Sequence, residues 1–149
     1  MNKRDEAEIG PPQNPQAAQI LVVDDETSIF DVFAMMFPTP HHALAVAADG
    51  NRAVQLASTQ PFDVAFVDCF LGSENGIEVA QNLRKVQPNL NIVLMSGYLR
   101  GENSAATEEA GACGFLTKPF SFETAQALVR RLLSRKQRKT QDTPAPEAS

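Results

Sequence analysis

Five short apolar runs, each followed by a stretch with helical spacing, occupy the central part of the chain. The first run, Ile20-Leu21-Val22-Val23, is continuously apolar, as expected of a strand that is buried on both faces. The other runs cover residues 43–47, 63–67, 91–95 and 114–117, and the helical stretches cover residues 27–37, 51–59, 77–86, 103–110 and 122–135. Strands that alternate with helices predict a doubly wound (βα)5 fold, an α/β sandwich with a five-stranded parallel sheet between two layers of helices.

The size and composition of the chain predict one domain. Its 149 residues, of which 43% are hydrophobic, are enough for one ordinary core. We expect the domain to cover residues 19–135, between a disordered arm at 1–18 and a disordered, basic, Pro-containing tail at 136–149. No effector domain fits after the last helix, so we expect output through protein binding. Without a signal peptide or an apolar run of about 20 residues, we expect a cytoplasmic protein without membrane contact.

Charge and cysteine content exclude several functional classes. The net charge is −5, but residues 19–129 hold 13 acidic and 5 basic residues, whereas residues 130–149 hold 6 basic and 2 acidic residues. An acidic domain is a poor match for nucleic acid, so we expect no direct contact with it. The basic end is interpreted as a solvated helix end, and a role in docking to an acidic partner stays open. Cys69 and Cys113 support neither a disulfide framework nor a cysteine-based zinc site.

Polar side chains follow four of the five apolar runs. Asp24 and Asp25 follow the first, Asp68 the third, Ser96 the fourth and Lys118 the fifth. The carboxyl ends of parallel strands meet at one edge of the sheet, so these groups should converge there. Three carboxylates in one place repel one another unless a cation joins them, and oxygen ligands such as Asp25 and Asp68 suit Mg²⁺. A solvated turn or a helix cap would explain an isolated Asp-Asp pair, but not the matching residues after three other strands.

Asp68 is the candidate nucleophile of this group. A carboxylate can attack phosphorus to form an acyl phosphate. Phosphoryl transfer otherwise needs positioning and charge neutralisation, which Lys118 can supply as a point charge and Ser96 as a hydroxyl donor. The combination of residues, rather than any one of them, points to this chemistry.

Over about residues 18–134 the chain resembles the receiver domain of two-component response regulators, of the stand-alone type. The matching motifs are Ile20-Leu21-Val22-Val23-Asp24-Asp25-Glu26, Asp68 with Gly76 eight residues later, Val93-Leu94-Met95-Ser96-Gly97 and Gly114-Phe115-Leu116-Thr117-Lys118-Pro119-Phe120. Each motif alone is weak, but their order and spacing are highly specific. The resemblance implies a flavodoxin-like fold with strand order 2-1-3-4-5.

The resemblance also implies a role for each residue. Asp68 would be phosphorylated by a histidine kinase or a histidine phosphotransfer protein, and the domain would catalyse only its own phosphorylation and dephosphorylation. The cofactor would be Mg²⁺, held by Asp25, Asp68 and the backbone carbonyl of Phe70, with Asp24 completing the acid pocket. Ser96 and an aromatic ring, Phe115, would form the switch. The fourth helix, fifth strand and last helix would present the signal to a downstream protein or form a homodimer.

One departure from the family pattern and three alternatives bear on this interpretation. Gly72 stands where proline is usual, so the loop over residues 72–75 is expected to be more mobile. A haloacid-dehalogenase-type phosphatase would need a second aspartate where Glu26 stands, and a flavodoxin-like redox protein would need a phosphate-binding loop after the first strand. A pseudo-receiver, which binds partners independently of phosphorylation, stays open, although the full residue set argues against it.

Overall fold

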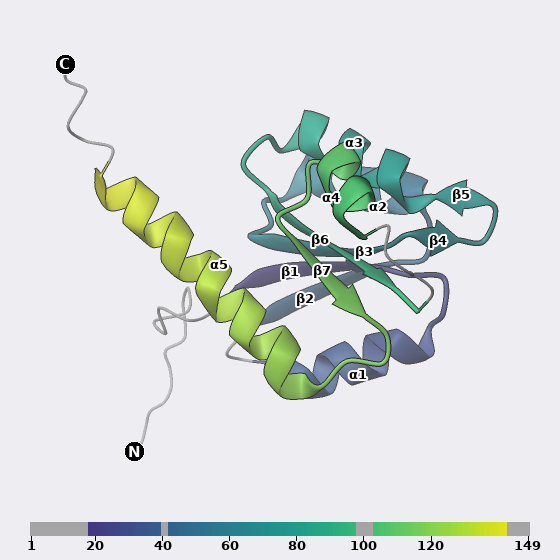
Figure 1. Ribbon diagram of the computed structural model, residues 1–149, viewed down its shortest axis with the longest axis horizontal. Coiled ribbons are helices and arrows are strands. Elements are labelled where there is room, and N and C mark those ends of the chain that lie inside the picture. The colour runs from purple at the N-terminus through teal and green to yellow at the C-terminus, as the bar shows by residue number, and fades with distance from the viewer. Residues whose placement is uncertain (1–17, 40–41, 98–102, 143–149) are drawn as a thin grey trace.

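The computed structural model describes residues 18–39, 42–97 and 103–142. Its centre is a five-stranded parallel sheet with the order β2-β1-β3-β6-β7 (Figure 1). The strands are β1 (Gln19–Val23), β2 (Ala43–Ala47), β3 (Val64–Asp68), β6 (Asn91–Ser96) and β7 (Gly114–Thr117). Numbered within this sheet alone, the order is 2-1-3-4-5, so the predicted fold class and topology are confirmed.

Helices cover both faces of the sheet. Figure 1 shows α2, α3 and α4 on one face and α1 and α5 on the other. The helices are α1 (Ser28–Met36), α2 (Gly50–Thr59), α3 (Gly76–Val86), α4 (Asn103–Ala110) and α5 (Phe122–Asp142). Among the helices of the described ranges, none combines the length and apolar character that a membrane span requires.

The continuous apolar strands are explained by two separate core layers. Along β1, Leu21 and Val23 face the cluster beneath α2, α3 and α4, whereas Ile20 and Val22 face the cluster beneath α1 and α5. All four side chains are fully buried. A strand between two helical layers has no solvated face, so it cannot alternate apolar with polar residues.

Local sequence signals set the start of two helices near the carboxyl edge of the sheet. The Asp49 carboxylate accepts a hydrogen bond from Arg52 N (2.8 Å) at the start of α2, and the Asn75 side chain accepts one from Ile77 N (2.8 Å) at the start of α3. Both residues satisfy backbone donors that the first turn of a helix leaves without a partner.

A short hairpin between β3 and α3 was not predicted. Its strands, β4 (Phe70–Leu71) and β5 (Glu74–Asn75), pair antiparallel, and Gly72 at the turn has a φ of 60°. Residues 72–75, which were predicted to form a loop, contain the turn and the second strand of this hairpin. Glycine supplies the left-handed conformation that the turn needs. Because β4 and β5 precede them, the predicted fourth and fifth strands carry the labels β6 and β7.

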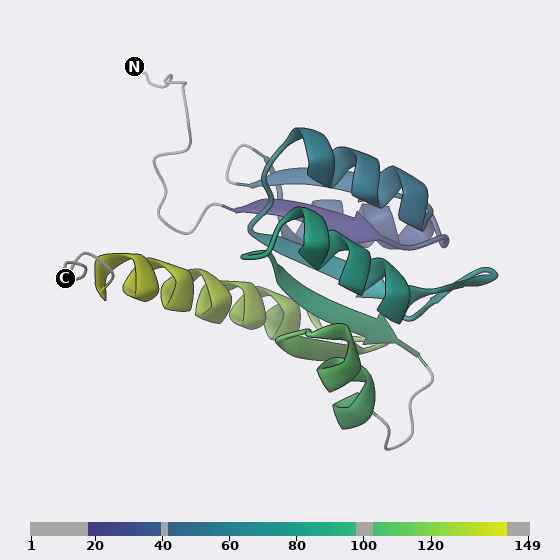
Figure 2. The ribbon, with the colours of Figure 1, turned by 90° about the horizontal axis from the view of Figure 1, so that it is seen from above.

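The last helix is longer than predicted. It continues past the expected end at Arg135 to Asp142, so the first part of the predicted disordered tail is helical. Figure 2 shows α5 extending well beyond the sheet. The added residues are mostly lysine, arginine and glutamine, which are good helix formers, and the next proline is Pro144. The predicted N-terminal arm, except Ala18, and the tail from residue 143 lie outside the described residues.

Candidate functional site

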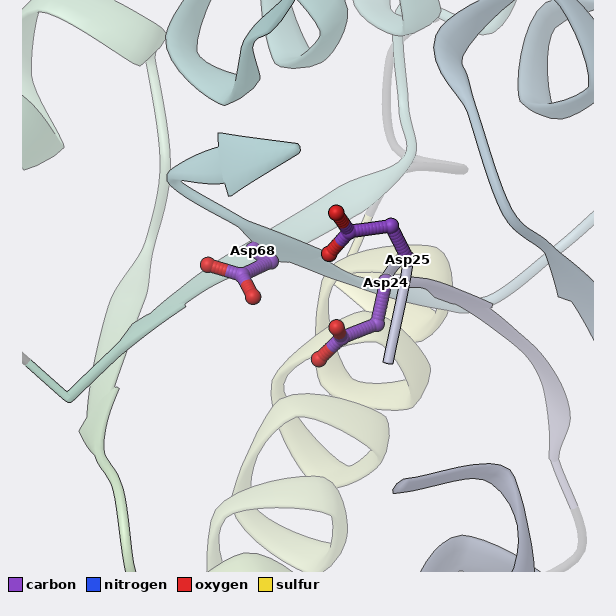
Figure 3. Close-up of side chains that lie close together, drawn as sticks. All are labelled: Asp24, Asp25 and Asp68. Carbon is purple, nitrogen blue, oxygen red and sulfur yellow. The ribbon is translucent and has the colours of Figure 1, made fainter. Parts of the chain in front are cut away.

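Three carboxylates meet at the carboxyl edge of the sheet. Asp24 and Asp25 follow β1 and Asp68 ends β3, and each offers an oxygen within 4.8 Å of the others (Figure 3). The register brings them together, because β1 and β3 are parallel neighbours that pair Val23 with Val67. Asp24 and Asp68 are buried, whereas Asp25 is exposed. The predicted convergence of these three residues is therefore observed.

Lys118 places a cation between two of these carboxylates. Its Nζ lies 2.7 Å from Asp24 Oδ2 and 2.9 Å from Asp68 Oδ2, and 3.7 Å from the exposed Glu26 carboxylate. Burial alone would lower the pKa of Lys118, but its hydrogen bonds to Asp24 and Asp68 outweigh burial and raise the pKa above 10.5. Lys118 is therefore charged at neutral pH and bridges the ends of β1 and β3 from the end of β7.

Asp24 is the most deeply buried member of the site. Burial raises its pKa, and the neighbouring Asp68 charge adds to this, while hydrogen bonds from Lys118 and from the Glu26 backbone N–H (2.9 Å) oppose the rise. Its side chain is fully buried, which leaves Asp25 as the solvent-facing carboxylate of the pair. The two adjacent aspartates thus have different environments.

Asp68 is held from both sides. Its Oδ1 accepts a hydrogen bond from the backbone N–H of Phe70 (3.0 Å), and its Oδ2 accepts one from Lys118. Phe70 begins the hairpin and its side chain is 57% exposed. The hairpin also borders the acid pair, since a Cβ built on Gly72 would lie 3.5 Å from Asp25 Oδ2. The segment after Asp68 therefore forms one wall of the site.

The two predicted switch residues lie on the last two strands of the sheet. Ser96 is buried at the end of β6, opposite Thr117, and its backbone carbonyl accepts a hydrogen bond from Lys118 N (2.9 Å). Phe115 is partly buried against the core cluster beneath α2, α3 and α4, and pairs with Leu94. The peptide bond between Lys118 and Pro119 is cis. Ser96 thus borders the site directly, whereas Phe115 lies further along β7.

The donor set fits a hard cation. The three carboxylates supply only oxygen ligands, and the exposed Asp25 leaves one side open to water. Mg²⁺ prefers oxygen ligands and commonly keeps several of its waters when a protein holds it through one or two carboxylates. The residues present therefore match the expected cofactor.

Cys69, next to Asp68, is expected to react slowly with thiol reagents. Its side chain is buried, and burial together with the Asp68 charge raises the pKa of the thiol from 9.0 to about 11. This rise in pKa lowers the fraction of Cys69 present as thiolate at pH 8 about a hundredfold, relative to a thiol of pKa 9.0. The pKa of the Cys69 thiol is higher in the folded protein than in the unfolded chain. The thiol therefore stabilises the folded state fully below pH 9.0, and this stabilisation is lost as the pH rises through about 11.

The measurement is alkylation by iodoacetamide at pH 8, followed by peptide mass spectrometry to separate Cys69 from Cys113. We expect Cys69 in the native protein to react at least about a hundredfold more slowly than in the urea-unfolded chain. Equal rates in the two states would contradict the buried, protonated thiol.

Two acidic residues take part in this region without having been assigned a role from the sequence. Glu26 faces Lys118 from solvent, and Glu74 accepts a hydrogen bond from the backbone N–H of Gly50 (2.9 Å), at the start of α2. Glu26 adjoins the acid pair, which was a usable signal. Nothing in the sequence pairs Glu74 with a helix that begins 24 residues earlier.

Comparison with known sequences supports the same assignment. A family model of the response regulator receiver domain matches residues 20–130, which is most of the chain. A probable transcriptional regulatory protein, TcrX, of Mycobacterium tuberculosis is 32% identical over 120 residues, which are 80% of this chain and 51% of that protein. The chain therefore spans about half the length of this relative.

Solved structures of receiver proteins have the same fold. A CheY-like response regulator receiver domain protein from Methanospirillum hungatei matches with a TM-score of 0.75 at 24% identity, covering 81% of this chain and 97% of that one. A response regulator from Burkholderia pseudomallei, crystallised with a phosphorylated aspartic acid, a calcium ion and citrate, matches with a TM-score of 0.70 at 25% identity, covering 82% and 72%. With the family model matched across the sheet and its acidic edge, the chain belongs to the receiver domains of two-component response regulators.

Proposed function

We propose that the chain accepts a phosphoryl group on Asp68 from a histidine kinase or a histidine phosphotransfer protein, in a Mg²⁺-dependent reaction in the cytoplasm. The observation that carries this proposal is the setting of Asp68: its Oδ2 lies 2.9 Å from the Lys118 ammonium, within a group of three carboxylates. A carboxylate nucleophile, a cation and oxygen ligands for a metal are what phosphoryl transfer to an aspartate needs. The phosphorylated aspartic acid in the Burkholderia structure supports the same chemistry.

The transfer exchanges one bond to phosphorus for another. A carboxylate oxygen of Asp68 forms a bond to phosphorus as the bond between phosphorus and the donor histidine breaks, and the electron pair returns to the imidazole nitrogen. Lys118 remains anchored to Asp24 at 2.7 Å, so its ammonium can turn from Asp68 Oδ2 to a phosphoryl oxygen without losing both partners. The cation thereby neutralises charge on the group that is transferred.

Asp25, Asp68 and the backbone carbonyl of Phe70 would hold the metal ion, and Asp24 would act indirectly. When bound, Mg²⁺ supplies positive charge that offsets the carboxylates and the phosphoryl oxygens. Asp25 is suited to this role because it is exposed, whereas Asp24 is already committed to Lys118 and to the backbone of Glu26.

The output is a phosphorylation-dependent protein contact. A phosphoryl group at Asp68 adds acceptor oxygens beside Ser96, and movement of Ser96 makes room for Phe115 to change position. The face formed by α4, β7 and α5 would then bind a downstream protein or a second copy of the chain. Proteins are proposed as the direct partners rather than nucleic acid, because residues 19–129 hold 13 acidic and only 5 basic residues.

The test is intact mass spectrometry after incubation with acetyl phosphate. We expect a mass gain of one phosphoryl group that requires Mg²⁺ and is prevented by EDTA. The gain should be reversed by hydroxylamine, which cleaves acyl phosphates. Absence of any gain, with small donors and with phosphorylated histidine proteins alike, would favour a pseudo-receiver that binds its partners without phosphorylation.

A further inference from the structure

Glu74 ties the hairpin after Asp68 to a helix on its other side. Its Oε1 accepts a hydrogen bond from the backbone N–H of Gly50 (2.9 Å), the first residue of α2. The first N–H groups of a helix have no partner within the helix and attract negative charge, so a carboxylate makes a strong bond there. Glu74 thus connects two segments that are 24 residues apart in the sequence.

The same hairpin carries a contact to the phosphoacceptor. Leu71 pairs with Glu74 and Phe70 pairs with Asn75, so the position of Glu74 fixes the position of Phe70. Phe70 in turn donates its backbone N–H to Asp68 Oδ1. A continuous set of hydrogen bonds therefore leads from the start of α2, through the hairpin, to the carboxylate of Asp68.

A groove borders part of the hairpin on the side of α4. Its volume is about 380 Å³, and Phe70, Ile77 and Ala106 are among its lining residues. Leu71 of the hairpin is buried in the core, and the bond from Glu74 to Gly50 connects the hairpin to α2.

Gly50 leaves the space that this carboxylate needs. A Cβ built on Gly50 would lie 2.9 Å from Glu74 Oε2 and 2.8 Å from Val79 Cγ2. Any larger residue at position 50 would force the Glu74 carboxylate and the Val79 side chain to shift. Removing the Glu74 carboxylate and obstructing its contact with the Gly50 N–H should therefore both weaken the connection between the hairpin and α2.

We propose that Glu74 is a positioning residue for the metal side of the phosphoacceptor site. It touches neither the phosphoryl group nor the metal, and acts by holding the hairpin so that Phe70 and Asp68 keep their places beside Asp25. This inference rests on the proposed function, because it assigns Glu74 to the same Mg²⁺-dependent transfer.

The test compares Glu74→Ala, Glu74→Gln and Gly50→Ala by calorimetric titration of the unphosphorylated protein with Mg²⁺. Residues that orient metal ligands typically contribute 10- to 100-fold, so Glu74→Ala should weaken Mg²⁺ binding by about tenfold. Glu74→Gln retains an oxygen acceptor and should stay within about twofold of wild type. Gly50→Ala should reproduce the defect, and the double variant with Glu74→Ala should be no worse than either single variant.

Two further readouts separate positioning from a merely structural role. In acetyl phosphate assays, Glu74→Ala should raise the half-saturating Mg²⁺ concentration about tenfold, with little change in the rate at saturating Mg²⁺. Amide hydrogen exchange should become faster at Gly50 and Phe70. Glu78→Ala is the matched control, since it removes the same charge from an exposed position on α3 and should change none of these quantities.

The proposal would be overturned if both Glu74→Ala and Gly50→Ala bound Mg²⁺ within twofold of the wild-type affinity. It would also be overturned if the wild-type protein bound no Mg²⁺. A lower unfolding temperature with unchanged Mg²⁺ affinity would show that Glu74 is only structural. If the wild type binds Mg²⁺ but takes up no phosphoryl group, the proposed function fails, whereas the titrations and exchange rates still decide the role of Glu74.

Discussion

Asp68→Asn should abolish the Mg²⁺-dependent mass gain from acetyl phosphate while leaving the protein folded. An amide oxygen is a poor nucleophile toward phosphorus and cannot form the acyl phosphate. Asparagine has nearly the same shape and keeps an oxygen acceptor for the Phe70 N–H, and Lys118 keeps its bond to Asp24. We therefore expect the free energy of unfolding to change by no more than about 1–2 kcal/mol.

The control for this prediction is Asp31→Asn, which removes the same charge from an exposed position on α1. It should be phosphorylated like the wild type. Intact mass gives the extent of phosphorylation, and urea denaturation followed by circular dichroism gives the stability of each variant. An undiminished mass gain in Asp68→Asn would move the phosphoacceptor to another residue.

Gly76→Ala should cause a larger loss of stability than the same substitution at Gly72 or Gly97, the other two glycines near the site. A Cβ at this position would collide with the backbone carbonyl oxygen of Asp68 and would lie 2.7 Å from the Cα of Cys69. Both obstacles are backbone atoms, so no change of rotamer can relieve the overlap. Overpacking that is relieved by backbone movement costs about 1–3 kcal/mol and occasionally more. Because two backbone groups obstruct this Cβ, we expect a loss of about 3 kcal/mol, and the shift would also displace the phosphoacceptor.

Gly97→Ala and Gly72→Ala are the matched comparisons, measured by urea denaturation with Gly76→Ala. A Cβ on Gly97 would meet only ordinary contacts, with Lys118 Cβ at 3.7 Å, so its effect should stay below about 1 kcal/mol. Gly72→Ala should cost about 1–2 kcal/mol, because alanine disfavours its φ of 60°. A loss below about 1 kcal/mol in Gly76→Ala would contradict the close approach of α3 to Asp68.

The features that the sequence predicted are those that depend on periodicity and on strand ends. The alternation of apolar runs with helical stretches led to the parallel sheet between two layers of helices, because parallel strands joined by helices have few arrangements. The strand order itself was implied by the resemblance to receiver domains. The meeting of Asp24, Asp25 and Asp68 followed from the rule that carboxyl ends of parallel strands share an edge. These inferences need no knowledge of individual side-chain contacts.

The features that the sequence did not predict depend on short segments and on three-dimensional contacts. Two-residue strands such as Phe70–Leu71 are too short to show a period of two. The bond between Glu74 and Gly50 exists only once the hairpin and α2 are placed side by side. Lys118 contacts both Asp24 and Asp68. The sequence did not predict this double contact, because it depends on the direction of one long side chain.

The length of α5 means that a small rotation at its start would produce a large displacement at its end. Its 21 residues span about 31 Å at 1.5 Å per residue, whereas its buried apolar side chains end at Leu133. A tilt of about 10° around the first turn would move the final turn by about 5 Å. A small rotation of α5 beside β7 would therefore displace its last turn by about the pitch of one helical turn.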